Sequence, residues 1–296
     1  MVKTVIRALR LPFITASILP FIFGSFIYRK NFDLPGFLFG LLAVVFTHLS
    51  ANLINDYYDS KSGADWLDKN FYGVFGGSKL IQENLLPEKF YLKGALFCAV
   101  ISFLCVAALA VILKSGFVLL IYLLIIALSW QYTAKPFAFS YNYLGELFIF
   151  LLFGPALVMG GYFIQSGVFP DVKSFIMSLP SGFFTAAILF ANEIPDFSTD
   201  KKSAKNNLVS LFGVRRAFIF YYILIFAGLL AILFCLFSGY LSPVSVISLL
   251  LVIPAVKAGD ILRRDYSDKP KLIGSSRLTI NIQAFSGVIL ILGLLL

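Results

Sequence analysis

The chain has 296 residues, 59% of them hydrophobic and 13% charged, and its mean hydropathy is +0.91. A soluble domain is nearer half apolar and about a quarter charged, so this composition excludes one and indicates a polytopic membrane protein. The net charge of +9 indicates a bilayer with anionic headgroups as the neighbour, and nothing in the sequence indicates nucleic acid. The three cysteines all lie in apolar runs and show no disulfide or metal-binding spacing.

Apolar runs long enough to cross a bilayer recur along the whole chain. A spanning helix needs about 20 apolar residues. The first run follows three basic residues, as in a signal peptide, but no small-residue cleavage site follows it, so we expect it to be a retained span. The nine expected spans are residues 11–28, 36–54, 91–113, 116–133, 143–166, 174–194, 217–238, 242–260 and 279–296. The predicted fold class is therefore all-α, in a single membrane-embedded domain over residues 1–296.

Basic residues set the expected orientation of these spans. With nine spans, the N-terminus and the loops after every second span share one side, and that side carries 20 of the 24 Lys and Arg residues. Cytoplasmic loops are the ones enriched in Lys and Arg. The sequence therefore predicts a cell (inner) membrane protein with a cytoplasmic N-terminus and an external C-terminus.

The second expected span ends in a polar stripe. Asn52, Asp56 and Asp59 stand at i, i+4 and i+7, which places them on one face if the chain is helical. Asn55 and Asp65 lie beside this stripe in the sequence. Acidic residues at the end of a membrane helix are costly, so they indicate a functional site.

A second stripe follows the sixth expected span. Asn192, Asp196 and Asp200 stand at i, i+4 and i+8, and a basic loop with Lys201 and Lys205 comes next. The order of span, acidic stripe and basic loop thus occurs twice. We interpret this as a weak four-helix repeat, 11–133 and 143–260, with an additional ninth helix over 279–296. Repeated halves of this kind commonly hold a site between them.

These residue types indicate a diphosphate site that depends on divalent cations. Two facing carboxylate clusters repel each other unless cations lie between them, and Mg²⁺ prefers carboxylate, amide and phosphate oxygens. Lys79, Lys201 and Lys205 are candidate partners for the remaining phosphate charge. Tyr57, Tyr58 and Tyr132 are candidates to stabilise a carbocation through their rings, and the 33 phenylalanines suit a hydrocarbon chain. The predicted chemistry is ionisation of a lipid diphosphate at the cytoplasmic face.

At these positions the chain resembles the UbiA superfamily of intramembrane prenyltransferases, and within it the 1,4-dihydroxy-2-naphthoate prenyltransferases of menaquinone synthesis. The resemblance rests on two acidic motifs and the segment between them: Asn52-x-x-Asn55-Asp56-x-x-Asp59-x-x-x-Gly63-x-Asp65, Gly77-Ser78-Lys79-Leu80-Ile81-Gln82, and Asn192-Glu193-x-x-Asp196-x-x-x-Asp200-Lys201. Arg10, just before Pro12, resembles the start of the family's first span, where snorkelling and phosphate contact are both open. The chain departs from the family in having Lys79 in place of an Arg, and Ala204-Lys205-Asn206-Asn207 in place of Gly-Lys-Lys/Arg-Thr.

The resemblance implies nine helices around a central cavity with two cytoplasmic cap loops, and transfer of a prenyl chain from a polyprenyl diphosphate donor to an aromatic acceptor. It implies two Mg²⁺ ions on the donor diphosphate, and a role for Asp65 in metal binding or in deprotonating the acceptor. The implied metal ligands are Asn52, Asp56, Asp59, Asp196 and Asp200. The candidate substrate-binding residues are Asn52, Asn55, Lys79, Asn192, Lys201, Lys205, Tyr132 and Arg10.

Three other interpretations are open on the sequence alone. A related prenyltransferase with another acceptor, namely 4-hydroxybenzoate, chlorophyllide, haem or a glycerol lipid, would share the acidic motifs. An ion-coupled secondary transporter would also have repeats and intramembrane acids, although its acids would lie deep within the spans. A non-catalytic lipid-binding scaffold would not need two acidic stripes. The clustering of the acids at the predicted cytoplasmic helix ends favours the enzyme.

Overall fold

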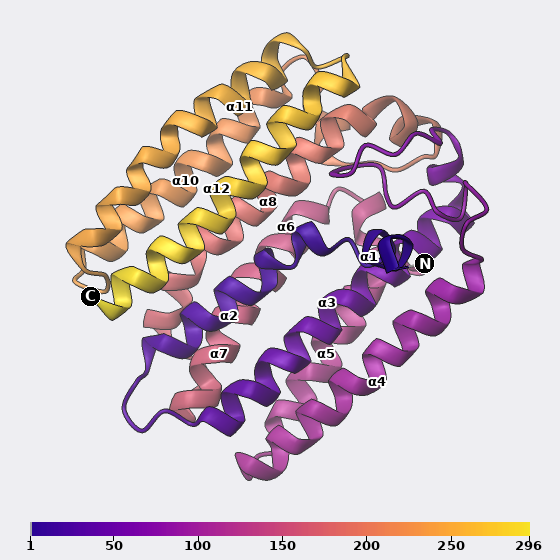
Figure 1. Ribbon diagram of the computed structural model, residues 1–296. Coiled ribbons are helices and arrows are strands. Elements are labelled where there is room, and N and C mark those ends of the chain that lie inside the picture. Colours follow the sequence, from indigo (N-terminus) through magenta and orange to yellow (C-terminus); the bar gives the residue numbers. More distant parts are fainter. Residues whose placement is uncertain (1) are drawn as a thin grey trace.

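The structure is a computed structural model that describes residues 2–296, and it is a bundle of long helices (Figure 1). The α-helices are α1 (Val2–Ala8), α2 (Thr15–Ile27), α3 (Leu34–Ser62), α4 (Glu88–Ile112), α5 (Phe117–Gln131), α6 (Gly145–Leu151), α7 (Leu157–Ser166), α8 (Val172–Lys202), α9 (Leu208–Phe212), α10 (Ala217–Phe237), α11 (Val252–Arg264) and α12 (Lys269–Leu295). Short 3₁₀ or π segments are η1 (Leu11–Phe13), η2 (Ala64–Trp66), η3 (Phe139–Tyr141), η4 (Leu152–Ala156) and η5 (Pro243–Leu251). No strand forms within this range, which confirms the predicted all-α class.

The predicted spans are recovered in position, but the described residues do not contain nine helices that meet the length and hydropathy needed to cross a membrane. Seven do so, and an eighth results if α1 and the segment Leu11–Ile27, bent by 48°, count as one span. The expected span at 116–133 corresponds to α5, which is apolar but has only 15 residues. The predicted four-helix repeat and the orientation in the membrane remain predictions.

Helix boundaries differ from the apolar runs because hydrogen bonding, and not hydropathy, sets them. Helix α3 continues to Ser62, well past the expected end at residue 54, and α12 begins ten residues earlier than residue 279. The carboxylates of Asp33, Asp171 and Asp268 accept hydrogen bonds from the backbone amides at the starts of α3, α8 and α12. Such N-caps satisfy amides that the helix itself leaves unpaired.

Small residues bring the central helices close together. A Cβ atom at Gly154 would lie 2.8 Å from the Cα of Gly182, so α8 packs directly on the η4 backbone. Pro155 lies inside η4, which is a π-helical turn between α6 and α7. Proline lacks an amide hydrogen and its ring conflicts with a regular helix, which accounts for a widened turn at this point. The turn carries Phe153 and Pro155 to the wall of the internal cavity.

Both long loops lie at one end of the bundle. In Figure 1 the segment after α3, the segment after α8 and α1 gather at the same end, whereas the C-terminus lies at the opposite end. The guanidinium of Arg7 in α1 donates to the carbonyl of Ser78 at 2.8 Å and pairs with Glu83 at 2.6 Å. These contacts fasten the first loop over the bundle. The fold therefore brings the ends of α3 and α8, which carry the two acidic stripes, under the two loops.

Candidate active site

An internal cavity of about 590 Å³ lies beneath the two loops, between α2, α3, α5, η4, α7 and α8. Cavities of roughly 300–1,000 Å³ are typical of small-molecule sites. Its polar lining near the loops includes Arg10, Asn52, Asn55, Asp59, Asp65, Asp68, Lys79, Tyr132, Asn192, Glu193, Asp196, Asp200 and Lys205. Its deeper lining is apolar and includes Phe21, Val44, Leu109, Phe163 and Ile164. The cavity thus combines a charged mouth with a hydrocarbon-like interior.

The first stripe is held by the N-terminal segment and the first loop. Asp56, only 2% exposed, accepts a hydrogen bond from the backbone amide of Ser78 at 3.2 Å, and its other oxygen lies 3.5 Å from Arg10. Arg10 also donates to the amide oxygen of Asn55 at 3.1 Å. The amide nitrogen of Asn52 donates to the carbonyl of Leu9 at 3.1 Å. Segments far apart in the chain therefore set the orientation of the stripe.

Asp59 is the point at which the two halves of the site meet. It accepts a hydrogen bond of 2.7 Å from the hydroxyl of Tyr141, and its second oxygen lies 3.7 Å from the ammonium of Lys205. Burial opposes the charge on Lys205, but the nearby acidic groups, with Asp59 and Asp200 foremost, raise the pKa of Lys205 well above its ordinary value. Lys205 is therefore a fixed positive charge between the stripes.

Asp65 and Lys79 form a buried ion pair across the first loop. The ammonium of Lys79 lies 2.8 Å from the Asp65 carboxylate and also donates to the Asp65 carbonyl at 3.2 Å. Both side chains are nearly inaccessible. Burial raises the pKa of Asp65 to about 7, with smaller contributions in the same direction from Asp59 and Asp56, although Lys79 lowers it. A carboxyl with a pKa near neutrality can take up or release a proton at the mouth of the cavity.

The second stripe is held by residues from later in the chain. Asp200 accepts a hydrogen bond of 2.9 Å from the side chain of Asn207, which also caps α9. Asp196 lies 3.8 Å from the ammonium of Lys269, the first residue of α12, and the same ammonium lies 2.7 Å from Asp68 in the first loop. Lys269 therefore links the loop after α3 to the stripe on α8.

The ligand set fits hard divalent cations that are shared with a phosphate ligand. One carboxylate oxygen of Asp56 and the amide oxygen of Asn192 are buried without a hydrogen-bond partner. Within residues 2–296, no three His, Cys, Asp or Glu side chains are grouped closely enough to hold an ion by themselves. Mg²⁺ commonly takes one or two carboxylates and completes its shell with water and substrate phosphates. The Asp56 oxygen without a hydrogen bond faces Arg10 at 3.5 Å, and a cation bound there would share it with that guanidinium. The spread of the carboxylates matches that mode of binding.

The structure gathers nearly all of the predicted site residues around one cavity mouth. Asp56 lies just behind the lining, and Lys201 is exposed on the last turn of α8, away from the cavity. Sequence reasoning missed Tyr141, Asn207 and Lys269, each of which contacts a predicted acid. No local pattern marks Tyr141 or Lys269, because their partners Asp59 and Asp196 are 82 and 73 positions away. Asn207 is only seven positions from Asp200, but its role as a helix cap and partner of that acid appears only in the structure.

Residues 17–274 match the UbiA prenyltransferase family. The chain belongs to this family. It is 29% identical over 209 residues to the 1,4-dihydroxy-2-naphthoate octaprenyltransferase of Bacillus subtilis, covering 69% of this chain and 64% of the relative. It is 30% identical over 228 residues to the UbiA prenyltransferase domain-containing protein 1 of Xenopus tropicalis, covering 75% of this chain and 64% of the relative. The chain thus spans somewhat less than two thirds of the length of these curated relatives.

The UbiA fold is also found in solved structures. A UbiA homologue from Archaeoglobus fulgidus, solved bound to DMAPP and Mg²⁺, superposes with a TM-score of 0.66 at 18% identity, covering 96% of this chain and 98% of the homologue. At this identity the likeness establishes the fold. Family membership and fold together favour the prenyltransferase interpretation over the transporter and the lipid-binding scaffold.

Proposed function

We propose that this UbiA family member transfers a prenyl chain from an isoprenoid diphosphate to an aromatic acceptor. The observation that carries the proposal is the cavity: two buried acidic helix ends and several basic side chains line one end, and apolar side chains line the rest. The acidic end suits a diphosphate with its metal ions, and the apolar part suits a hydrocarbon chain. Neither a transporter nor a scaffold requires this combination.

In this proposal the donor diphosphate binds at the cavity mouth. Asn52, Asp56, Asp59, Asp196 and Asp200 would hold two Mg²⁺ ions with the diphosphate. Bound Mg²⁺ supplies positive charge that offsets the charge of the departing diphosphate. Lys205 lies between the stripes and adds charge from the protein itself, and Arg10 does so beside Asp56. Lys79 would join them only by leaving its ion pair with Asp65.

The same cavity accounts for control of the reactive allylic cation. Bond cleavage between the prenyl carbon and the diphosphate oxygen leaves positive charge on the hydrocarbon. The ring of Tyr132 lies on the cavity wall near the mouth, where an aromatic face stabilises a cation. The apolar walls exclude water, which would otherwise capture the cation. The acceptor ring then supplies the electrons for the new carbon–carbon bond.

We further propose 1,4-dihydroxy-2-naphthoate as the acceptor, which would place the chain in menaquinone biosynthesis. The support is the sequence motif set and the similarity to the Bacillus subtilis relative of that name. A bond would then form between the prenyl carbon and the acceptor ring carbon, and the ring–carboxylate bond would break with release of CO₂. Asp65, with its pKa of about 7, is a candidate to take a proton from an acceptor hydroxyl.

The proposal is tested by supplying purified protein in detergent with Mg²⁺, labelled geranyl diphosphate and a panel of acceptors that includes 1,4-dihydroxy-2-naphthoate and 4-hydroxybenzoate. We expect a prenylated aromatic product that disappears on chelation with EDTA and returns with Mg²⁺ or Mn²⁺. Product from 4-hydroxybenzoate alone would change the acceptor assignment. Absence of product with every acceptor would overturn the proposed function. Full activity after exhaustive chelation would overturn its metal dependence.

A further inference from the structure

The imidazole of His48, in the cavity wall, has one ring nitrogen without a partner and is not used by the proposed diphosphate site. His48 lies on α3 one turn before Asn52, lines the cavity and is only 7% exposed. Its Nδ1 atom lies 2.7 Å from the hydroxyl of Ser17 on α2, whereas its Nε2 atom is buried without a hydrogen-bond partner. Leaving such a nitrogen unpaired in an apolar wall costs free energy, so a bound ligand is expected to satisfy it.

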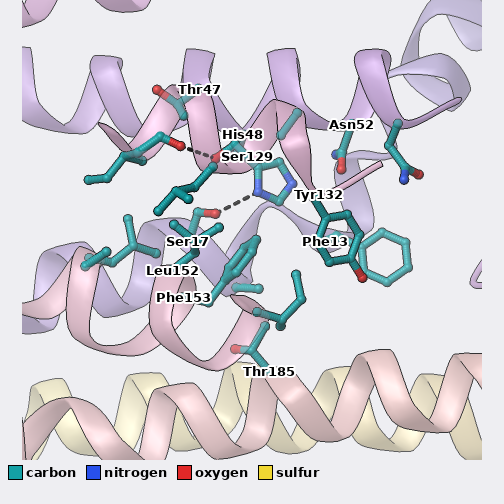
Figure 2. Close-up of a pocket in the computed structure, with 18 of the residues that line it drawn as sticks. Phe13, Ser17, Thr47, His48, Asn52, Ser129, Tyr132, Leu152, Phe153 and Thr185 are labelled. Carbon is teal, nitrogen blue, oxygen red and sulfur yellow. Dashed lines mark hydrogen bonds between the residues drawn. The ribbon is translucent and has the colours of Figure 1, made fainter. Parts of the chain in front are cut away.

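The surroundings of His48 hold its ring in one orientation. The ring packs edge-on against Phe153, with centroids 5.9 Å apart and planes 86° apart. Figure 2 shows Ser17 hydrogen-bonded to one side of the ring, with Phe13, Tyr132 and Asn52 drawn toward the other side. Phe153 belongs to η4, the π turn that contains Pro155, so this irregular segment places Phe153 against the His48 ring.

The hydrogen bond to Ser17 also assigns the ring tautomer. The 2.7 Å contact permits either direction, and we assign Ser17 as the donor: a hydroxyl that accepted from Nδ1–H would leave its own hydrogen without a partner among the described side-chain contacts. In a neutral imidazole that accepts at Nδ1, the hydrogen is on Nε2. In this tautomer Nε2 carries the hydrogen. The atom itself is buried in the cavity wall, so a ligand oxygen has to press close against the ring to accept a hydrogen bond from it.

The aromatic acceptor is the substrate better placed to provide that oxygen. The donor diphosphate belongs at the acidic mouth, where Asn52, the innermost proposed ligand, is four residues farther along α3, about 6 Å of helix rise, and Asp56 is eight residues farther, about 12 Å. The rest of the donor is hydrocarbon and cannot accept a hydrogen bond. An aromatic acceptor carries hydroxyl or carboxylate oxygens and has to lie beside the prenyl carbon.

We propose that His48 is a positioning residue for the aromatic acceptor: its Nε2–H donates to an acceptor oxygen and orients the ring toward the prenyl carbon, while Ser17 sets the tautomer. This inference rests on the proposed prenyl transfer. It assigns acceptor recognition to a polar pair, His48 and Ser17, one turn deeper than the acidic stripe.

The test compares two amide substitutions at position 48. The side-chain nitrogen of His48→Gln can reach the position of Nε2, whereas that of His48→Asn reaches only the position of Nδ1. With geranyl diphosphate, Mg²⁺ and the acceptor that the wild type uses, His48→Asn should raise the acceptor KM about tenfold, as expected for one lost hydrogen bond to a ligand. His48→Gln should restore most of the acceptor affinity. The donor KM should stay within about twofold in both variants.

A matched control is Ser129→Ala, since Ser129 also lines the cavity but its hydroxyl already donates to the carbonyl of Ile125 at 2.8 Å. Its acceptor KM should match the wild type. Acceptor analogues that lack the carboxylate or one hydroxyl provide a second readout: for one of them, wild type and His48→Asn should have equal KM values.

Several results would overturn the assignment. Equal behaviour of the Asn and Gln variants, a change in donor KM alone, or a penalty that no analogue removes would each show that Nε2 does not bind the acceptor. If both His48 variants fail to fold, Ser17→Ala with the same analogues replaces them, with a rise in acceptor KM expected. A wild-type protein that makes no product would instead refute the proposed function itself.

Discussion

Replacing Lys79 by Met should destabilise the protein in a way that depends on pH, because Lys79 is the partner of the buried Asp65 carboxylate. The two side chains lie 2.8 Å apart and are nearly inaccessible. In the wild type, burial raises the pKa of Asp65 from 3.8 to about 7 even though Lys79 lowers it. Without the ammonium, the same burial should raise that pKa further, so the carboxyl of the variant stays protonated to higher pH.

The sign and size of the effect follow from proton linkage. A carboxyl whose pKa is higher in the folded protein favours folding at low pH, and this contribution is lost as the pH rises toward the folded pKa. In the wild type the loss stops near pH 7, because Asp65 ionises there. In Lys79→Met the loss of stability continues above pH 7. The difference in unfolding free energy between the wild type and Lys79→Met should therefore widen by about 1.4 kcal/mol per pH unit above 7. Below pH 6 the gap should be constant.

Thermal unfolding in detergent with EDTA, from pH 5.5 to 8.5, measures this effect without bound metal. The melting temperature of Lys79→Met should fall away from that of the wild type only above pH 7. The double variant Lys79→Met/Asp65→Asn is the control, and its gap to the wild type should not widen in this way. A gap that is independent of pH in the single variant, or one that persists unchanged in the double variant, would refute the reasoning.

Asp56→Ala should reduce turnover by about three decades or more while the protein still folds, since a lost metal contact removes several kcal/mol of transition-state stabilisation. Asp260→Ala, at a partly exposed carboxylate outside the cavity lining, is the reference, and an active Asp56→Ala would contradict the site. Ala204→Gly should raise the free energy of unfolding by about 1 kcal/mol, because Ala204 has a positive φ of 55° that glycine adopts without strain. Thermal unfolding measures this change, and an unchanged melting temperature would contradict the prediction. A cysteine introduced near residue 70 should be labelled from the cytoplasmic side and one near residue 171 from the other side; the reverse pattern would overturn the orientation.

The helical class, the position of the spans and the two acidic stripes were predictable from the amino-acid sequence. These features are local: a span depends on a continuous apolar run, and the Asn52, Asp56 and Asp59 stripe depends on the helical repeat of 3.6 residues. The sequence also shows that Ala204 stands where the family pattern has a glycine. The structure adds the physical meaning, because Ala204 has a left-handed backbone conformation.

The groups that surround each acid could not be predicted in this way, because they depend on how the helices and loops pack. Tyr141, Lys205 and Lys269 reach Asp59 and Asp196 from distant segments, and such pairings leave no periodic signal in the chain. Helix ends were likewise decided by partners in space, since α3 continues past its apolar run. There its polar side chains bind the first loop and the N-terminal segment instead of lipid, so the helix can extend beyond the length that hydropathy predicts.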